Sequence, residues 1–305
     1  MIDHIRIGTR ESKLALWQAM QVSGYLNPQH NNELILIKSE GDINLVTPLY
    51  ELGVQGIFTK ALDIALLEHR VDIAVHSYKD VPTQLAAGLQ VAAVLKRGNP
   101  FDVMVCKNEM SAENFNQPDG MFSIATSSIR RRAQWLSRYP NYQIENLRGN
   151  VQTRLQKLQT SEWQGAIFAA AGLERLGLTE KETGPQIVLD WMLPAPAQGA
   201  VVIVCRKGDE QILEICAGIN DEATAICTGV ERDFLRILQG GCSTPIGAFA
   251  KMEEDDITLT CNITATDGSE VVSLTITENV ANVALLAHNA AKVIIEKGGK
   301  ALLHK

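Results

Sequence analysis

Apolar residues recur with two different spacings along the first two thirds of the chain. Residues 4–9, 33–40 and 71–78 are short apolar segments of the kind that form strands. Between them, residues 13–26 and 56–70 place apolar side chains at helical spacing. Strands that alternate with helices predict an α/β fold with a mostly parallel sheet.

Two pairs of segments repeat the same layout at a distance in the chain. Residues 7–18 (IGTRESKLALWQ) resemble residues 124–135 (IATSSIRRRAQW), each a strand, a Thr/Ser-rich turn and a helix that begins among basic residues. Residues 71–82 and 164–177 form a second pair, in which a strand runs into a polar turn. This repetition predicts two similar α/β lobes with a cleft between them.

The C-terminal part of the chain has a different pattern. An amphipathic helix is predicted over 222–239 and ends at Gly240 and Gly241. The dipeptide Asp267-Gly268 is a strong hairpin signal. Three strands and a closing helix complete an α-β-β-β-α unit: residues 246–252, 256–266, 270–279 and 280–297.

We therefore predict an α/β protein of three domains. The first lobe comprises residues 1–98 plus 196–215, the second lobe residues 99–195, and the small α-β-β-β-α domain residues 216–305. The chain is expected to return to the first lobe within 191–207, where two prolines and a glycine precede an apolar strand.

Composition and charge exclude several classes of protein. The 305 residues carry a formal net charge of −7, which argues against a general nucleic-acid-binding surface. No apolar run approaches the ~18 residues that span a bilayer, and the N-terminal segment lacks the layout of a signal peptide, so we expect a cytoplasmic protein without membrane contact. The six cysteines form no CxxC pair and the six histidines are scattered, so no metal site is expected.

One cysteine differs from the others. Cys242 follows Gly240 and Gly241 in the segment LQGGCSTPIG, which we interpret as a loop that presents the thiol. The preceding helix C-terminus disfavours a thiolate and no histidine lies nearby in the sequence, so an attachment point fits better than a fast nucleophile. The remaining cysteines lie in apolar strand or helix patterns and are predicted to be inert packing residues: Cys106, Cys205, Cys216, Cys227 and Cys261.

Arginines gather after predicted strand ends although the protein as a whole is acidic. Residues 126–132 combine hydroxyls and guanidinium groups at a predicted helix N-terminus, an arrangement that binds anions. Ligands of open α/β sheets bind at the carboxyl ends of strands. We therefore predict a polyanion-binding cleft formed by Arg10, Ser12, Thr126, Ser127, Ser128, Arg130, Arg131, Arg148, Arg154 and Arg175.

Asp80 supplies a carboxylate to this predicted cleft. It follows Lys79 just past the strand at 71–78 and precedes Val81 and Pro82. A carboxylate in a basic cleft stabilises a developing cation or binds N–H donors. A turn-forming aspartate before Val-Pro is the alternative that these residues alone leave open.

Taken together, these segments resemble the hydroxymethylbilane synthase family, also called the porphobilinogen deaminases. The resemblance covers essentially the whole chain in order. Its more specific segments are HSYKDVP at 76–82, RGNVQTRL at 148–155 and the GGC loop at 240–242. The fold that it implies has two lobes like those of periplasmic binding proteins and a third domain, usually in a monomer.

The resemblance implies a transferase of tetrapyrrole and haem biosynthesis. In this family the loop cysteine, here Cys242, carries a dipyrromethane cofactor through a thioether bond. Four molecules of the substrate porphobilinogen are added to it head to tail, each with loss of ammonia. Hydrolysis then releases linear 1-hydroxymethylbilane and leaves the dipyrromethane attached.

The resemblance also implies roles for individual residues. Asp80 is expected to be catalytic, binding pyrrole N–H groups and stabilising the cation that forms when ammonia leaves, and Phe58 is expected in the substrate pocket. The residues expected to bind the acetate and propionate groups are Arg10, Ser12, Ser77, Lys79, Thr126, Ser127, Ser128, Arg130, Arg131, Arg148, Arg154, Arg175 and Gln198.

Four positions depart from the usual pattern of the family. Gln55 stands where lysine is common and Ala61 where glutamate is common, in or beside a predicted lid at 41–56. Lys13 replaces a common proline, and Ala197 replaces a common glycine. The first two departures bear on contacts of the lid rather than on the chemistry.

Two other functions compete with this interpretation. A non-catalytic, two-lobed anion-binding protein would explain the lobes and the arginines, but not Asp80 together with Cys242. A cysteine-dependent hydrolase or acyltransferase needs a general base near a reactive Cys242. Iodoacetamide labelling distinguishes a free thiol from one blocked by a covalent cofactor.

Overall fold

A computed structural model of the chain describes residues 4–27, 29–39, 59–107, 115, 122–241 and 244–303. The described residues fall into two compact units. The first unit lies within residues 1–45, 54–98 and 199–226, and the second within 99–198 and 227–305. The lid predicted at 41–56 is outside the described residues, and the domain boundaries given by the sequence stay a prediction.

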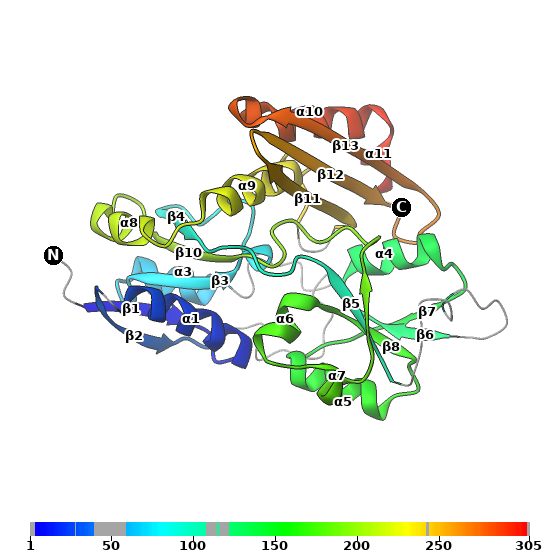
Figure 1. The fold of residues 1–305 in the computed structure, drawn as a ribbon, viewed down its shortest axis with the longest axis horizontal. Helices are drawn as coiled ribbons and strands as arrows, with labels where there is room; N and C mark the ends of the chain where they lie inside the picture. Colours follow the sequence, from blue (N-terminus) through cyan, green and yellow to red (C-terminus); the bar gives the residue numbers. More distant parts are fainter. Residues whose placement is uncertain are drawn as a thin grey trace. The chain divides into compact units, whose positions relative to one another are not determined.

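The first unit is built on a five-stranded sheet in the order β2-β1-β3-β10-β4 (Figure 1). β1 (His4–Thr9) pairs in parallel with β2 (Asn31–Leu36) and with β3 (Ile73–Ser77). β10 (Val201–Arg206) lies antiparallel between β3 and β4 (Leu89–Val94). The sheet is therefore mixed, with the antiparallel strand supplied by a distant part of the chain.

Helices α1 (Lys13–Leu26), α3 (Lys60–Leu67) and α8 (Glu210–Ala217) contact this sheet. α1 begins after Ser12, whose Oγ accepts the N–H of Ala15 at 3.3 Å and so caps the helix. Apolar residues of α1 and α8 share one core with the central strands. In each helix, helical spacing places the apolar residues on one face, and the sheet buries that face.

The second unit contains a five-stranded sheet in the order β7-β6-β8-β5-β9. β6 (Ser123–Ala125) pairs in parallel with β7 (Gln143–Glu145) and β8 (Gly165–Ala169). β5 (Asp102–Cys106) lies antiparallel between β8 and β9 (Gln186–Leu189). The helices that connect these strands are α4 (Ile129–Arg138), α5 (Val151–Thr160), α6 (Ala170–Arg175) and α7 (Glu180–Thr183).

The two five-stranded sheets have the same topology. β1 followed by α1 and β6 followed by α4 occupy equivalent places, and so do β3 and β8. This confirms the prediction of two similar α/β lobes. Each sheet has two parallel and two antiparallel pairings, so the expectation of a mostly parallel sheet was wrong. The reason is that β10 and β5 each lie between two strands of a sheet and run antiparallel to both of them.

The C-terminal part of the second unit is a three-stranded antiparallel sheet in the order β11-β12-β13. Gly268 has φ 78 in the turn between β12 and β13, a left-handed conformation that suits glycine. The predicted α-β-β-β-α order is confirmed by α9 (Glu222–Ile237), β11 (Ile246–Glu253), β12 (Asp256–Thr264), β13 (Val271–Asn279) and α10 (Val283–Glu296). A 3-10 turn, η3 (Val280–Asn282), and α11 (Gly299–Leu302) flank α10.

An aromatic cluster holds α4 on its sheet. The Trp135 side chain is fully buried, with ring centroids of Tyr139 and Phe115 at 4.8 and 5.2 Å. Tyr142 and Trp191 complete the cluster at 5.4 and 6.0 Å from Trp135. Since large buried rings carry much of the packing energy, they fix the helix whose first turn carries Arg130 and Arg131.

The predicted packing cysteines are confirmed as buried free thiols. They are Cys106, Cys205, Cys216, Cys227 and Cys261. Burial raises the pKa of Cys106 to about 11 and those of Cys216 and Cys261 to about 12. Cys106, Cys216 and Cys261 therefore stay protonated and unreactive at neutral pH. Across the described ranges, no helix is long and apolar enough to cross a membrane.

Candidate active site

In the first unit, the predicted site residues follow the carboxyl ends of two neighbouring parallel strands, β1 and β3. The antiparallel strand β10 begins at the same edge of the sheet, because Val201 is paired with Ser77. This is the edge at which ligands of open α/β sheets bind. It carries Arg10, Ser12, Ser77, Lys79 and Asp80.

Hydrogen bonds to two other elements fix the segment that carries Asp80. The Ser77 side chain contacts the side-chain amide of Gln18 on α1, with Nε2 donating to Oγ at 2.8 Å. The N–H of Tyr78 donates to the carbonyl of Ala200 at 3.0 Å. The 3-10 turn η1 (Tyr78–Asp80) is therefore held on both sides, and it places the half-buried Asp80 at the strand edge.

The histidine that precedes this segment is neutral. His76 is buried in β3, and its burial, aided by the positive charge of Arg10, lowers its pKa to about 4. A neutral imidazole leaves the charges at this edge to Arg10, Lys79 and Asp80. His76 was predicted only as part of the segment HSYKDVP at 76–82.

In the second unit, the predicted residues again follow the carboxyl ends of parallel strands, here β6, β7 and β8. β5 begins at this edge, because Asp102 is paired with Ala169, the last residue of β8. The two units thus place their predicted residues at equivalent edges of equivalent sheets. In the second unit these residues are Thr126, Ser127, Ser128, Arg130, Arg131, Arg148, Arg154 and Arg175.

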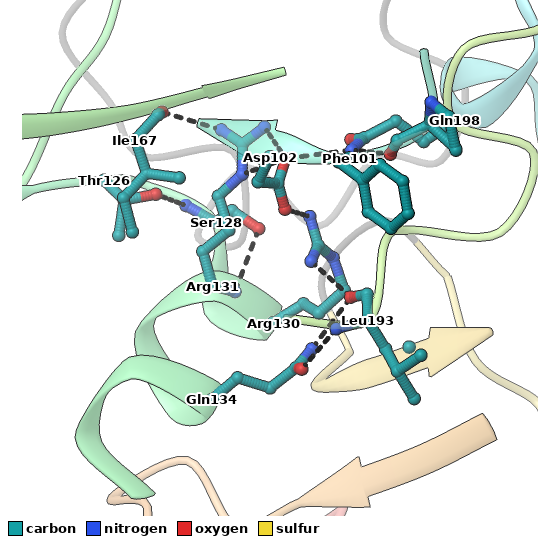
Figure 2. Close-up of polar contacts among 12 residues, drawn as sticks. Phe101, Asp102, Thr126, Ser128, Arg130, Arg131, Gln134, Ile167, Leu193 and Gln198 are labelled. Atoms are coloured by element: carbon teal, nitrogen blue, oxygen red, sulfur yellow. Dashed lines mark hydrogen bonds and ion pairs between the residues drawn. The ribbon is translucent and has the colours of Figure 1, made fainter. Parts of the chain in front are cut away.

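The three hydroxyls after β6 order the loop that leads into α4. Thr126 Oγ1 accepts the N–H of Ser128 at 3.2 Å, and Ser128 Oγ accepts the N–H of Arg131 at 3.4 Å (Figure 2). Ser127 Oγ accepts the N–H of Leu147 at 2.8 Å, which ties the loop after β6 to the loop after β7. The predicted hydroxyl cluster therefore forms a structured helix N-terminus.

Arg148 and Arg154 are joined through one turn. Gly149 between them has φ 111, and its carbonyl accepts a hydrogen bond from Nε of Arg154 at 2.8 Å. Arg148 is buried, and this burial lowers its pKa. Burial likewise lowers the pKa of Arg175 at the end of α6. Both guanidinium groups are partly desolvated cations, and an anion stabilises such a cation.

Arg130 and Arg131 are paired with a carboxylate that the sequence did not single out. Arg130 Nη2 donates to Oδ2 of Asp102 at 2.8 Å, and Arg131 donates to Oδ1 through Nε at 3.1 Å and Nη2 at 2.7 Å (Figure 2). Gln198 Nε2 donates to the same Oδ1 at 2.8 Å and to the carbonyl of Pro100 at 2.7 Å. The structure thus brings three predicted residues together around Asp102.

Asp102 and Gln18 were not predicted as site residues from the sequence. Asp102 begins an apolar strand and Gln18 lies within an amphipathic helix, where a single polar residue is normally solvent-exposed. Both side chains are buried instead. For Asp102, the available signal in the sequence was its position at the start of an apolar strand. Of the predicted site residues, Phe58 and Cys242 lie outside the described residues.

Two family models match consecutive parts of the chain. The model described as "Porphobilinogen deaminase, dipyromethane cofactor binding domain" matches residues 5–214. The one described as "Porphobilinogen deaminase, C-terminal domain" matches residues 225–296. The chain belongs to the porphobilinogen deaminase family. This confirms the resemblance, together with the transferase class and the dipyrromethane cofactor that it implied.

Curated relatives agree over nearly the full length. The porphobilinogen deaminase of Desulforamulus reducens is 39% identical over 100% of this chain and 98% of its own length. That of Legionella pneumophila is 41% identical, covering 98% of this chain and 97% of its own. That of Syntrophotalea carbinolica is 38% identical, covering 98% and 95%.

Similarity to solved structures is much weaker. Lipoprotein Tp32 from Treponema pallidum matches with a TM-score of 0.44 and 9% identity, over 73% of this chain and 92% of that chain. A YaeC family lipoprotein from Enterococcus faecalis matches with a TM-score of 0.41 and 12% identity, over 73% and 95%. Likeness at this level is too weak to show a shared fold.

Ala197, one of the departures from the family pattern, adopts a strained backbone. Its φ is 62, a left-handed conformation that costs an L-residue roughly 1–2 kcal/mol. Its N–H donates to Oε2 of Glu231 at 2.6 Å. We expect Ala197→Gly to raise the free energy of unfolding by about 1 kcal/mol, because glycine tolerates this φ but loses more chain entropy.

Urea denaturation measures this effect. Ala200→Gly is the matched control, since Ala200 lies in the same segment, is buried and has no positive φ. The same substitution there should lower stability. A less stable Ala197→Gly protein would show that the left-handed conformation of Ala197 is not a source of strain.

Proposed function

We propose that this chain joins four porphobilinogen molecules head to tail onto a covalently bound dipyrromethane, with loss of four ammonia molecules, and then hydrolyses the product to linear 1-hydroxymethylbilane. The observation that carries the proposal is the similarity of the whole chain to porphobilinogen deaminases. The placement of the predicted residues at equivalent strand edges of the two units supports it.

The chemistry of the residues fits the dipyrromethane. Each pyrrole ring carries an acetate and a propionate, so the cofactor and the growing chain are polycarboxylates. Guanidinium groups bind carboxylates through two parallel N–H donors. Burial lowers the pKa of Arg148 and of Arg175, and a bound carboxylate would favour the charged form of each.

When bound, the dipyrromethane supplies the pyrrole carbon to which the next unit is joined. We assign its attachment to Cys242 and a place in the substrate pocket to Phe58. We assign the holding and orienting of the carboxylates to the residues of the predicted site. They are Arg10, Ser12, Ser77, Lys79, Thr126, Ser127, Ser128, Arg130, Arg131, Arg148, Arg154, Arg175 and Gln198.

Asp80 is the proposed catalytic residue. Loss of ammonia from porphobilinogen leaves a positive charge delocalised over the pyrrole, and a carboxylate close to it lowers the energy of that state. The hydrogen bond between Tyr78 and Ala200 and the contact of Ser77 with Gln18 hold the backbone before Asp80 in place. A carboxylate fixed in advance need not reorganise during the reaction.

Cofactor attachment is tested by the intact mass of the purified protein, before and after incubation with porphobilinogen. Wild type is expected to exceed the mass of the bare chain by two linked pyrrole units. Cys242→Ser is expected to match the bare chain under both conditions, because its hydroxyl is a much weaker nucleophile than a thiol.

The matched control is Cys227→Ser, which changes a buried packing cysteine and should keep the adduct. If wild type gains no adduct after incubation, the proposed synthase activity is wrong, and a non-catalytic anion-binding protein becomes the better interpretation. If Cys242→Ser keeps the adduct, the attachment site is wrong.

We further propose that the protein acts on this small molecule as a cytoplasmic monomer, independently of membranes and nucleic acid. The net charge of −7 supports the last point, since a surface that binds nucleic acid is generally basic. Sedimentation of the loaded protein at micromolar concentration tests the oligomeric state, and a dimer there would contradict it.

A further inference from the structure

Asp102 and two backbone carbonyls together orient the guanidinium groups of Arg130 and Arg131. The carboxylate is fully buried and accepts hydrogen bonds from both guanidinium groups. Each guanidinium is also tied to a carbonyl: Nη1 of Arg130 donates to Leu193 at 2.6 Å, and Nη1 of Arg131 to Ile167 at 2.9 Å. Two fixed ends leave each group a single orientation (Figure 2).

Both arginines have N–H groups that these contacts do not use. A guanidinium has five N–H groups, and the described contacts use two of Arg130 and three of Arg131. Nε of Arg130 is buried and has no hydrogen-bond partner in the described part of the chain. An unsatisfied buried donor carries a free-energy cost that a bound acceptor would remove.

The cluster also has an excess of positive charge. Two guanidinium groups and one carboxylate sum to +1, and the three residues are only 4%, 6% and 0% exposed for Arg130, Arg131 and Asp102. Burial, followed by the charge of Arg131, lowers the pKa of Arg130, while Asp102 opposes this shift. Without Asp102, the repulsion between the two adjacent cations would be unopposed in a poorly solvated place.

We propose that Asp102 is a positioning residue, which fixes the guanidinium groups of Arg130 and Arg131 in the orientation that binds a carboxylate of the dipyrromethane. The inference rests on the proposed function and extends it to a residue outside the predicted site. Asp102 acts only through the two arginines. Because Asp102 lowers the positive charge of the cluster, it can favour carboxylate binding only by orienting the two guanidinium groups.

Charge and geometry make opposite predictions for Asp102→Asn. The substitution raises the charge of the cluster from +1 to +2, so a site that worked by charge alone would bind carboxylates more strongly. An asparagine, however, presents an amide N–H₂ to one of the guanidinium groups, and two donors then face each other. Orientation is lost, and positioning predicts weaker binding despite the greater charge.

The experiment measures how fast unloaded protein gains the dipyrromethane when porphobilinogen is supplied, read as intact mass. We expect Asp102→Asn to load about tenfold or more slowly than wild type, the factor equivalent to one charge-assisted hydrogen bond. The rise in Tm that loading produces should shrink as well, since bound ligand stabilises in proportion to its affinity. Loading at the wild-type rate or faster would overturn the proposal.

Asp72→Asn is the matched control. Asp72 also pairs with two arginines, accepting from Arg6 Nη2 at 2.7 Å and Arg206 Nη2 at 3.4 Å. It precedes β3 and so lies at the opposite edge of its sheet. Asp72→Asn should lower the Tm of the unloaded protein and still load at the wild-type rate. Equal slowing in both variants would mean that general destabilisation explains the effect.

Asp102→Glu keeps the charge and moves the carboxylate by one methylene group. If Asp102 is a positioning residue, this variant should also load slowly. It therefore tests the proposal if Asp102→Asn does not fold. Wild-type loading by a folded Asp102→Glu would then overturn the proposal. A wild type that gains no adduct refutes the synthase activity itself, whereas normal loading of wild type and of the Asp102 variants refutes only the positioning role.

Discussion

Asp80→Asn is expected to keep the fold and the bound dipyrromethane but to turn over porphobilinogen about 10²–10³-fold more slowly than wild type, the usual cost of removing one group that stabilises transition-state charge. Asparagine has nearly the same shape as aspartate, so the turn at Tyr78–Asp80 should persist. The variant lacks the negative charge that offsets the cation formed when ammonia leaves. The defect should therefore appear in the kcat of protein that already carries the dipyrromethane.

Consumption of porphobilinogen by protein of known adduct content measures this prediction. Asp209→Asn is the control, because it makes the same chemical change at the N-cap of α8 in the same unit. Asp209 follows β10, whose end lies at the opposite edge from Ser77. Asp209→Asn should turn over at close to the wild-type rate. An Asp80→Asn protein with more than about a tenth of wild-type kcat would remove Asp80 from the catalytic role.

Glu231→Gln is expected to lower the free energy of unfolding by about 3 kcal/mol, the upper range for a buried polar group left without its partner. The Glu231 side chain on α9 is fully buried. Its Oε2 accepts the N–H of Ala197 at 2.6 Å and its Oε1 accepts the N–H of Ala250 at 2.7 Å. A glutamine has one carbonyl oxygen, so one of these N–H groups would face an amide N–H₂.

Urea denaturation of the unloaded protein measures this loss. Glu222→Gln is the control, since Glu222 begins the same helix and is exposed. That substitution should change the free energy of unfolding by less than about 0.5 kcal/mol. The same small change for Glu231→Gln would mean that the two backbone hydrogen bonds do not depend on the carboxylate.

Local patterns in the sequence were sufficient for the elements and for much of the candidate site. Alternation of apolar residues placed Ile257, Leu259 and Cys261 on one face of β12, and all three are fully buried. The repeated strand-turn-helix segments led to two sheets of one topology. Residues just past strand ends were then predicted to meet at one edge, because parallel strands end at the same side of a sheet.

Local patterns were insufficient for strand direction in the middle of each sheet. β10 and β5 read as apolar strands, but nothing within either segment indicates that it runs antiparallel to its neighbours. That direction follows from where the chain crosses over, which involves residues far apart in the sequence. The antiparallel start of β5 is also what brings Asp102 to the edge where β8 ends.

By itself, the sequence of this protein determined its α/β class, its repeated lobes, its inert cysteines and the family to which it belongs. These depend on spacing along the chain and on segments that stay contiguous. Only the tertiary structure decided that Asp102 pairs with Arg130, Arg131 and Gln198, at separations of 28, 29 and 96 residues. A buried charge needs partners close in space, and their distance along the chain has no bearing on that requirement.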